Sequence, residues 1–280
     1  MKYVLFNPLS KNGNSKEKVE FLRKDSNYNL VNVLEDGEYE RVLNVLTKDD
    51  ELHLYGGDGT LNHFVNRVRG LDIPCNVYFN TSGTGNDFYH DVAKNGDTDL
   101  IIINNYIKNL PTVIVNGKEY SFINGVGFGI DGYCCEKGDE LQAKSDKSVN
   151  YTSIAIKGLL FHFKPRSGRV TVDGVTKEYK KIWIAPAMKG KFYGGGMMVA
   201  PEQDRLNADE TITSVVFHGT GKLRTLMVFP KLFNGTHVKH KKIFDIRVGK
   251  HIIVEFDKPT ALQIDGETIK NVTKYEVIVK

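Results

Sequence analysis

The stretch LHLYGGDGTL, residues 52–61, decides the fold of the first part of this chain. Leu52–Tyr55 has the composition of a short strand, and the apolar residues at positions 61, 64, 65 and 68 follow the spacing of an amphipathic helix. Gly56 and Gly57 stand between them, where residues without a Cβ allow the chain to turn sharply. A strand, a glycine turn and a helix in this order predict an α/β unit.

The same alternation of strand and helix extends through residues 1–110. Further strands are expected at Val4–Phe6, Leu30–Val33 and Val77–Phe79. Helices are expected at Ser15–Lys24 and Tyr39–Leu46, the second because its apolar residues recur at the spacing of one helix face. A βαβα order predicts a parallel sheet with helices on its faces, and ligands of such sheets bind beyond the carboxyl ends of the strands.

From about residue 111 the pattern changes to short β-rich runs. They are Thr112–Val115, Ser121–Asn124, Arg169–Val172, Lys181–Ala187, Met197–Ala200, Ile212–Phe217, His251–Phe256 and Ala261–Ile264. Asn-Gly or Asp-Gly pairs at 116–117, 173–174 and 265–266 favour tight hairpin turns. Two helices are expected, at Tyr151–Phe163 and Lys222–Phe233. Residues 1–110 are therefore predicted to form an α/β domain, and residues 111–280 a mostly antiparallel β domain.

Composition and charge narrow the class of protein. The 280 residues are 40% hydrophobic and 26% charged, as in ordinary globular domains, and no apolar run of about 18 residues predicts a membrane-spanning helix. The apolar start is too short for a signal peptide, and the three cysteines lack disulfide or zinc spacing, which favours the cytoplasm. Residues 1–110 carry 12 Lys or Arg and 16 Asp or Glu, whereas residues 111–280 carry 26 and 18. The basic second half suits an anionic partner, or is simply a solvated basic surface.

The glycine turn has the features of a phosphate-binding site. The backbone N–H groups of Gly56 and Gly57 can approach a phosphate closely, and the start of the following helix adds positive potential. Asp58 can orient a magnesium ion or its waters, and Thr60 can cap the helix. A plain strand-to-helix turn with a capping threonine is the alternative interpretation.

A second polar turn, SGTGNDF at residues 82–88, follows the expected strand Val77–Phe79. Thr84 offers a hydroxyl group, and Asn86 and Asp87 offer polar groups that can cap the next helix. Because neighbouring parallel strands end at the same edge of a sheet, both turns are predicted to line one crevice. Alone, the second turn would be a loop with a helix cap; beside the first it predicts a nucleotide site.

Together these two turns resemble those of the diacylglycerol kinase catalytic domain family, which includes bacterial lipid kinases and the sphingosine and ceramide kinases. Four further segments resemble motifs of that family, in the same order along the chain: Asn7-Pro8-Leu9-Ser10, Gly127-Phe128-Gly129-Ile130-Asp131, Gly194-Gly195-Gly196 with Ala200-Pro201, and Gln263-Ile264-Asp265-Gly266-Glu267. The ordered set covers nearly the whole chain. Lys11, Thr81 and Glu210 depart from it, because the family usually has glycine, proline and glycine there.

The resemblance implies a fold and a set of site residues. The fold is an α/β domain with a parallel sheet, similar to that of NAD kinases and phosphofructokinases, followed by a mostly antiparallel β-sandwich that takes the lipid substrate. ATP would be held by Asn7, Pro8, Ser10, Gly56, Gly57, Asp58, Gly59, Thr60, Thr84, Asn86 and Asp87. Glu267 and Asp265 would serve the reacting hydroxyl, with Glu267 the usual catalytic residue. A magnesium site would use Asp209 and the carbonyl groups of Leu206 and Thr211.

The sequence therefore predicts a kinase that uses ATP and Mg²⁺ to phosphorylate a hydroxyl of a membrane lipid, with diacylglycerol, which gives phosphatidic acid, as the first choice. A carboxylate near the acceptor hydroxyl suits this chemistry, although Asp-Gly-Glu taken alone is an ordinary hairpin turn. The nucleotide site is expected in the cleft between the two domains. An NAD kinase-type small-molecule kinase and a non-catalytic nucleotide-binding sensor are the alternatives.

The expected location is the cytoplasm, with peripheral contact to the anionic inner face of the membrane. Candidate contact residues are Lys157, Lys164, Arg166, Lys239, Lys241 and Lys242. Nucleic acid is not an expected partner, because the basic residues are scattered, and a homodimer is left open. The apolar helix at Tyr151–Phe163 is interpreted as part of the core, in preference to a membrane contact. Gly127-x-Gly129-x-x-Gly132 lacks the βαβ unit of a dinucleotide site, and His237-x-x-His240 is interpreted as part of a basic loop.

Overall fold

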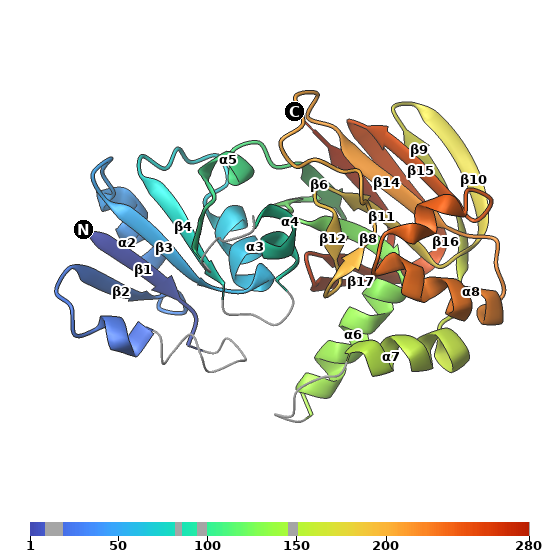
Figure 1. Cartoon of the computed structure of the whole chain (residues 1–280), viewed down its shortest axis with the longest axis horizontal. Coiled ribbons are helices and arrows are strands. Elements are labelled where there is room, and N and C mark those ends of the chain that lie inside the picture. The colour runs from blue at the N-terminus through green and yellow to red at the C-terminus, as the bar shows by residue number, and fades with distance from the viewer. Residues whose placement is uncertain (9–18, 82–85, 94–99, 145–150, 280) are drawn as a thin grey trace. The chain divides into compact units, whose positions relative to one another are not determined.

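The structure is a computed structural model that describes residues 1–8, 19–81, 86–93, 100–144 and 151–279. The chain divides into two compact units, Met1–Asn109 and Leu110–Lys280. Figure 1 shows helices and strands alternating in the first unit and a large sheet in the second. Each unit has its own buried core, so each is described by itself.

The first unit is built on a five-stranded sheet of order β2-β1-β3-β4-β5. The strands are β1 (Lys2–Phe6), β2 (Tyr28–Asn32), β3 (Glu51–Gly56), β4 (Asn76–Thr81) and β5 (Leu100–Ile102). The pairs β1–β2, β1–β3 and β3–β4 are parallel, and β5 runs antiparallel to β4. The predicted parallel sheet is confirmed, with an antiparallel edge strand that was not foreseen.

Helices follow the strands of this sheet. They are α2 (Glu38–Val45), α3 (Asp58–Arg67), α4 (Asp87–Val92) and α5 (Asn104–Ile107). Leu61, Phe64 and Val65 are buried on one side of α3, as their spacing predicts. Of the helix expected at Ser15–Lys24, residues 15–18 lie outside the described part of the chain, and residues 19–22 are helical.

The second unit is built on a ten-stranded sheet in which every pairing is antiparallel. Its strands are β6 (Thr112–Val115), β7 (Lys118–Ser121), β8 (Gly125–Gly129), β9 (Arg166–Val172), β10 (Val175–Ile182), β11 (Ile184–Met188), β14 (Ile212–Phe217), β15 (Phe244–Gly249), β16 (His251–Ile264) and β17 (Glu267–Ile278). A separate small hairpin is formed by β12 (Phe192–Tyr193) and β13 (Met197–Met198). One apolar core draws residues from β6, β8, β9, β10, β11, β14, β16 and β17, which means that this sheet folds over on itself.

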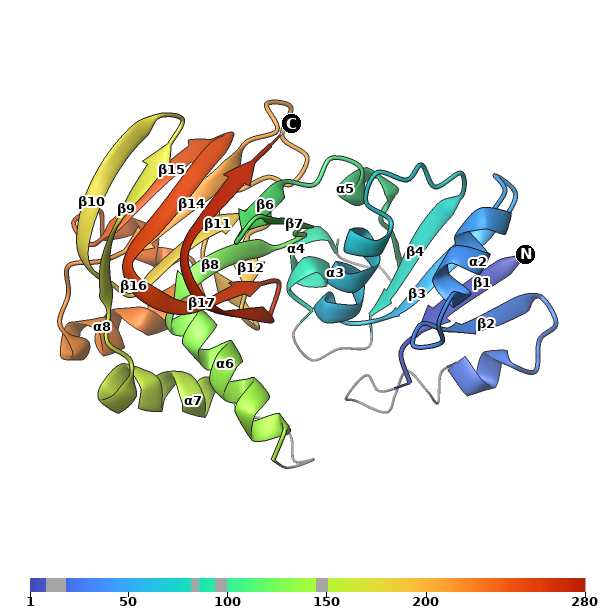
Figure 2. The same cartoon turned by 180° about the vertical axis from the view of Figure 1, so that it is seen from behind.

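Helices cover another part of this sheet. They are α6 (Ile130–Gln142), α7 (Tyr151–Lys157) with the wide turn η1 (Gly158–His162), and α8 (Lys222–Val228) with the tight turns η2 (Phe229–Leu232) and η3 (Thr236–Lys239). A second core joins them to β11 and β14, with Trp183 and Phe217 among its largest buried side chains. Figure 2 shows α6, α7 and α8 gathered on one side of the unit.

The structure corrects the expected elements in several places. Of the expected strand Ser121–Asn124 only Ser121 lies in a strand, at the end of β7, and the strand β8 that begins at Gly125 was not foreseen. His251–Phe256 and Ala261–Ile264 belong to one long strand, β16, and Lys181–Ala187 is divided between β10 and β11. Helix α6 was not foreseen at all. Its buried side carries Gly132, Cys134 and Gly138 in place of large apolar residues, so it gives little helical periodicity. A Cβ on Gly132 would lie 2.3 Å from the Ala261 carbonyl oxygen, so the glycine allows α6 to pack closely on β16.

Candidate active site

The glycine turn of the first unit joins β3 directly to α3. A Cβ on Gly56 would lie 2.2 Å from Thr60 Oγ1, so only glycine fits there. Gly57 occupies the N-cap position, and the first helical hydrogen bond runs from Leu61 N to the Gly57 carbonyl at 3.1 Å. The N–H groups of the first helical turn precede this bond and point out of the helix start, where phosphates bind. Thr60 lies inside the helix and is not its cap.

Asp58 links this turn to the next one. Its carboxylate accepts hydrogen bonds from Asp87 N at 2.7 Å and from Phe88 N at 3.0 Å. Asn86, at a left-handed φ of +40°, precedes α4, and its Nδ2 donates to Thr81 Oγ1 at 3.2 Å. The structure therefore brings Asp58, Asn86 and Asp87 together, as the sequence predicted for the walls of one site. Thr84 lies outside the described residues.

The end of β1 lies at the same edge of the sheet. Phe6 pairs with Tyr55, which places Asn7 and Pro8 beside the turn that begins at Gly56. Ser10 lies outside the described residues. Asn80 Nδ2 and Asn86 Oδ1 are buried near this edge and, within the described part of the chain, have no hydrogen-bond partner. Buried polar atoms without partners are uncommon, so these two atoms fit a site that a polar ligand completes.

In the second unit, the Asp-Gly turn between β16 and β17 carries the predicted acidic pair. Asp265 and Gly266 have φ angles of +46° and +93°, as a tight hairpin turn requires. The Asp265 carboxylate accepts three backbone hydrogen bonds, from Ile123 at 2.6 Å, Asn124 at 2.8 Å and Gly125 at 2.9 Å. Both of its oxygens are thus engaged, whereas Glu267 begins β17 with an exposed side chain.

Two buried side chains support this turn from behind. Gln263 Oε1 accepts a hydrogen bond from Gly266 N at 2.9 Å, and Gln263 Nε2 donates to Asp131 Oδ2 at 3.4 Å. Asp131 is 5% exposed in the first turn of α6, and its burial raises the pKa of this carboxyl to about 6. Both residues stand in segments that resemble family motifs, but the sequence alone gave them no role.

A buried cation holds the other side of the same segment. Arg205 is 5% exposed; its Nη1 donates to the Ile123 carbonyl, and its Nη2 donates to Asn124 Oδ1 at 2.5 Å. Residues 123–125 therefore lie between Arg205 and the carboxylate of Asp265. Arg205 was not foreseen, because an arginine in a polar stretch of sequence gives no sign that it is buried.

The loop implied to bind magnesium is closed by side-chain amides. Asn207 Nδ2 donates to the carbonyl groups of Asp204 at 2.6 Å and of Thr211 at 3.0 Å, and Gln203 Nε2 donates to both carbonyls at 3.0 Å. Two N–H donors thus occupy the carbonyl oxygen of Thr211, which a cation would need as a ligand. In this arrangement the Thr211 carbonyl, one of the three implied ligands, is not available to a magnesium ion.

The departure at position 210 is explained by the backbone. Glu210 has a φ of +53°, in the left-handed region that favours glycine, so the loop keeps the shape that a glycine would adopt there. The Asn207 side chain also accepts hydrogen bonds from Thr211 N at 2.8 Å and from Thr211 Oγ1 at 3.1 Å. Local side-chain bonds therefore stabilise the strained turn.

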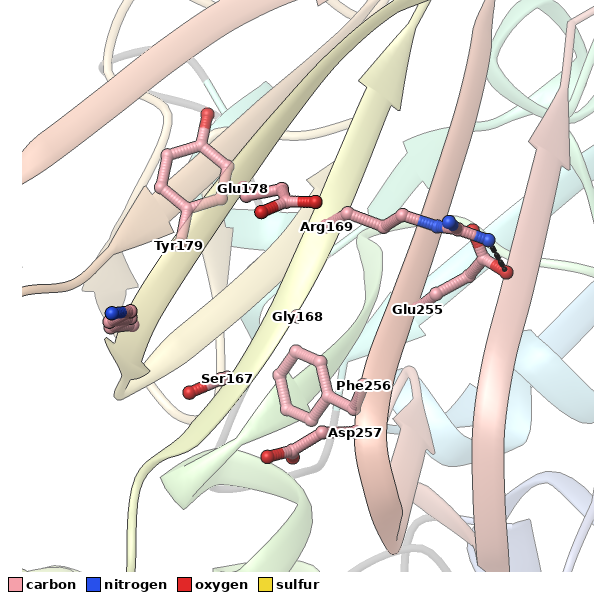
Figure 3. A pocket seen from close by; sticks show the side chains of 9 residues that line it. Ser167, Gly168, Arg169, Glu178, Tyr179, Glu255, Phe256 and Asp257 are labelled. Carbon is pink, nitrogen blue, oxygen red and sulfur yellow. Dashed lines mark hydrogen bonds and ion pairs between the residues drawn. The ribbon is translucent and has the colours of Figure 1, made fainter.

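An open groove of about 630 Å³ lies away from these residues, between β9, β10 and β16. Figure 3 shows Arg169 and Glu255 paired on neighbouring strands, with Phe256, Glu178 and Tyr179 also on its walls. Arg169 Nε lies 2.6 Å from Glu255 Oε2, so these two charges of the groove already neutralise each other. The groove contains none of the predicted site residues.

Comparison with known proteins agrees with this description. The fold class of this chain is a parallel α/β unit, with turns of the kind that bind phosphate, followed by a folded antiparallel sheet. The sequence profile of the diacylglycerol kinase catalytic domain matches residues 2–114, and that of the YegS C-terminal NAD kinase beta sandwich-like domain matches residues 124–278. The chain therefore belongs to the diacylglycerol kinase catalytic domain family with a YegS-type C-terminal domain.

Individual relatives are distant. A diacylglycerol kinase of Mycobacterium tuberculosis is 23% identical over 205 residues, which cover 71% of this chain and 64% of that protein. A candidate lipid kinase of Staphylococcus epidermidis is 27% identical over 78% of this chain and 70% of its own length. The crystal structure of a candidate diacylglycerol kinase from Bacillus anthracis shares the fold, with a TM-score of 0.70 at 17% identity, over 100% of this chain and 92% of that one. No helix among the described residues is long and apolar enough to span a membrane.

Proposed function

We propose that this chain is an ATP-dependent lipid kinase that phosphorylates the free hydroxyl of diacylglycerol and gives phosphatidic acid. The observation that carries the proposal is the unequal acidic pair on the β16–β17 turn. Asp265 is engaged by three backbone N–H groups, and Glu267 is the exposed carboxylate next to it. Membership of the diacylglycerol kinase catalytic domain family supports the same reaction class.

The first unit supplies the nucleotide side of the proposal. The N–H groups at the start of α3 would bind phosphate oxygens, and Asp58 keeps the α3 and α4 starts in fixed register. Asn7 and Pro8 lie at the same sheet edge. We propose that Mg²⁺ accompanies the ATP phosphates, where it would neutralise negative charge during transfer.

The second unit supplies the acceptor side. Glu267 would take the proton of the lipid hydroxyl. The hydroxyl oxygen forms a bond to the terminal phosphorus of ATP, while the bond between this phosphorus and the ADP oxygen breaks. Asp265 would not take this proton, because its oxygens hold residues 123–125. It is a positioning residue that fixes the turn from which Glu267 projects. We propose that the reaction takes place at the cytoplasmic face of an anionic membrane, where the lipid lies.

An assay with labelled ATP and mixed micelles tests the proposal. The acceptors are diacylglycerol, monoacylglycerol, a sphingoid base and undecaprenol, and NAD serves as the control for the alternative kinase class. We expect label in phosphatidic acid, and loss of that label in Glu267→Gln. Label in NADP would favour the NAD kinase alternative. ATP binding without turnover on any acceptor would favour the non-catalytic sensor.

A further inference from the structure

Two neighbouring helices of the second unit expose large apolar side chains. Leu223, Phe161 and Met227 are 73%, 70% and 63% exposed, the highest values for large apolar residues among the described part of this unit. Phe161 lies in η1 at the end of α7, and Leu223 and Met227 lie one turn apart on α8. Lys222 Nζ donates to the Leu160 carbonyl at 2.9 Å, and Figures 1 and 2 both show the end of α7 beside α8. We call the surface formed by Phe161, Leu223 and Met227 the helical face.

The opposite sides of these helices are also apolar and already buried. Val228 of α8 and Leu159 of η1 belong to the core that they share with β11 and β14. An ordinary amphipathic helix presents polar residues to water on the side away from the core. Apolar side chains on both sides of α8 therefore point to a partner that covers the helical face.

The two segments that carry this surface are basic in sequence. Residues 151–172 contain four Lys or Arg, residues 211–244 contain six, and neither segment contains an Asp or Glu. Lys157, Lys164 and Arg224 are exposed beside the apolar residues and form no ion pair within the described part of the chain. An apolar centre carried by two basic segments is typical of surfaces that bind anionic bilayers.

We propose that the helical face inserts into the headgroup region of an anionic lipid bilayer, with the surrounding Lys and Arg side chains bound to lipid phosphates. This assignment rests on the proposed function, because a lipid kinase must reach a substrate that stays in the bilayer. A second copy of the same face is a poorer occupant, because its basic surround would meet like charge. The expectation that Tyr151–Phe163 is mainly core is revised: Leu159 and Phe163 are core, and Phe161 faces outward.

Vesicle flotation of the full chain tests the assignment, with vesicles of phosphatidylcholine alone and of phosphatidylcholine and phosphatidylglycerol in equal parts. The variant Leu223→Gln/Met227→Gln keeps good helix-forming residues and should weaken partition to the mixed vesicles about thirtyfold. The variant Lys157→Gln/Lys164→Gln/Arg224→Gln should weaken it about fivefold per removed charge, and this loss should shrink at high salt. The control Val175→Thr/Val248→Thr changes two exposed apolar residues on β10 and β15 and should partition like wild type.

Other outcomes would overturn the assignment. If the Leu223/Met227 variant partitioned to vesicles like wild type, another surface would meet the membrane. The same would follow if the variant lost a self-association of the wild-type protein but still bound vesicles. Activity distinguishes this failure from failure of the proposed function. On short-chain diacylglycerol dispersed as single molecules, the variant should retain wild-type turnover, whereas on vesicles it should lose turnover in proportion to binding. If the wild-type protein bound vesicles but phosphorylated no lipid, the proposed membrane surface would be retained and the proposed lipid kinase activity would be rejected.

Discussion

The carboxylate of Asp58 accepts a hydrogen bond from the backbone N–H of Asp87 at 2.7 Å, so a residue that follows β3 holds the start of the helix that follows β4. A further bond from Phe88 N, at 3.0 Å, uses the second oxygen. The two turns expected to bind nucleotide phosphates are thereby connected. Displacement of one turn should therefore displace the other, which would couple the stability of this edge to the proposed binding of ATP.

Replacement of Asp58 by Ala should therefore lower both stability and turnover. Loss of the acceptor leaves two N–H groups at the start of α4 without their partner, which costs about 1–3 kcal/mol of unfolding free energy, and misplaced phosphates should reduce kcat at least about a hundredfold. Urea denaturation and the lipid kinase assay measure the two effects. The exposed Asp72 provides the control Asp72→Ala, expected to behave as wild type. An Asp58→Ala protein with full stability would show that the Asp87 contact contributes nothing.

Substitutions at the β16–β17 turn should separate support from chemistry. Glu267→Gln removes an exposed carboxylate and should change unfolding free energy by less than about 0.5 kcal/mol, while kcat falls about 10²–10⁴-fold. Asp265→Asn places an amide N–H₂ near three N–H donors and should destabilise the second unit by about 2 kcal/mol or more. The exposed Glu178 gives the control Glu178→Gln. A stable Asp265→Asn would contradict the positioning role of Asp265, and a fully active Glu267→Gln would contradict the catalytic role of Glu267.

The alternation of strands and helices in the first unit was predictable because large apolar residues mark each element. The hairpin turns could also be predicted from the sequence. Positive φ angles, which their composition indicates, are found at Asn116-Gly117, Asp173-Gly174 and Asp265-Gly266. Helix α6 could not be predicted in this way, because after Ile130 its buried side consists of aspartate, glycine and cysteine. Motif spacing could point to Asp265 and Glu267 as a pair, but only the hydrogen bonds to residues 123–125 distinguish them. Likewise, Arg205 becomes visible only through its burial.

The pKa of Asp131 makes a prediction for stability against pH. Burial raises this pKa from an ordinary 3.8 to about 6, so the folded state binds a proton that the unfolded state has released between these pH values. The penalty of burying the charge is absent below about pH 4, grows through pH 6 and is then complete, at about 3 kcal/mol. Asp131→Asn removes it. The variant should therefore gain stability relative to wild type as pH rises from about 4 to 7.

Urea denaturation at several pH values measures this gain. The control Asp139→Asn lies on the same helix with an exposed side chain and should show no such pH-dependent difference. A stability gap between wild type and Asp131→Asn that stays constant from about pH 4 to pH 7 would mean that Asp131 is ionised throughout and compensated by its neighbours.

Metal removal tests the loop that the family resemblance assigns to magnesium. Asn207 donates to the carbonyl group of Thr211, so a protein N–H group occupies one of the oxygens that a cation would use. Wild type should then keep the same melting temperature in EDTA and in excess Mg²⁺. Asn207→Asp removes the two donors and adds a carboxylate, so it should melt several degrees lower in EDTA and regain part of that loss with Mg²⁺. The control Asp209→Asn alters the exposed carboxylate of the implied site and should respond to neither condition. A wild-type melting temperature that falls on chelation, together with a destabilised Asp209→Asn, would show that a bound cation displaces the Asn207 amide.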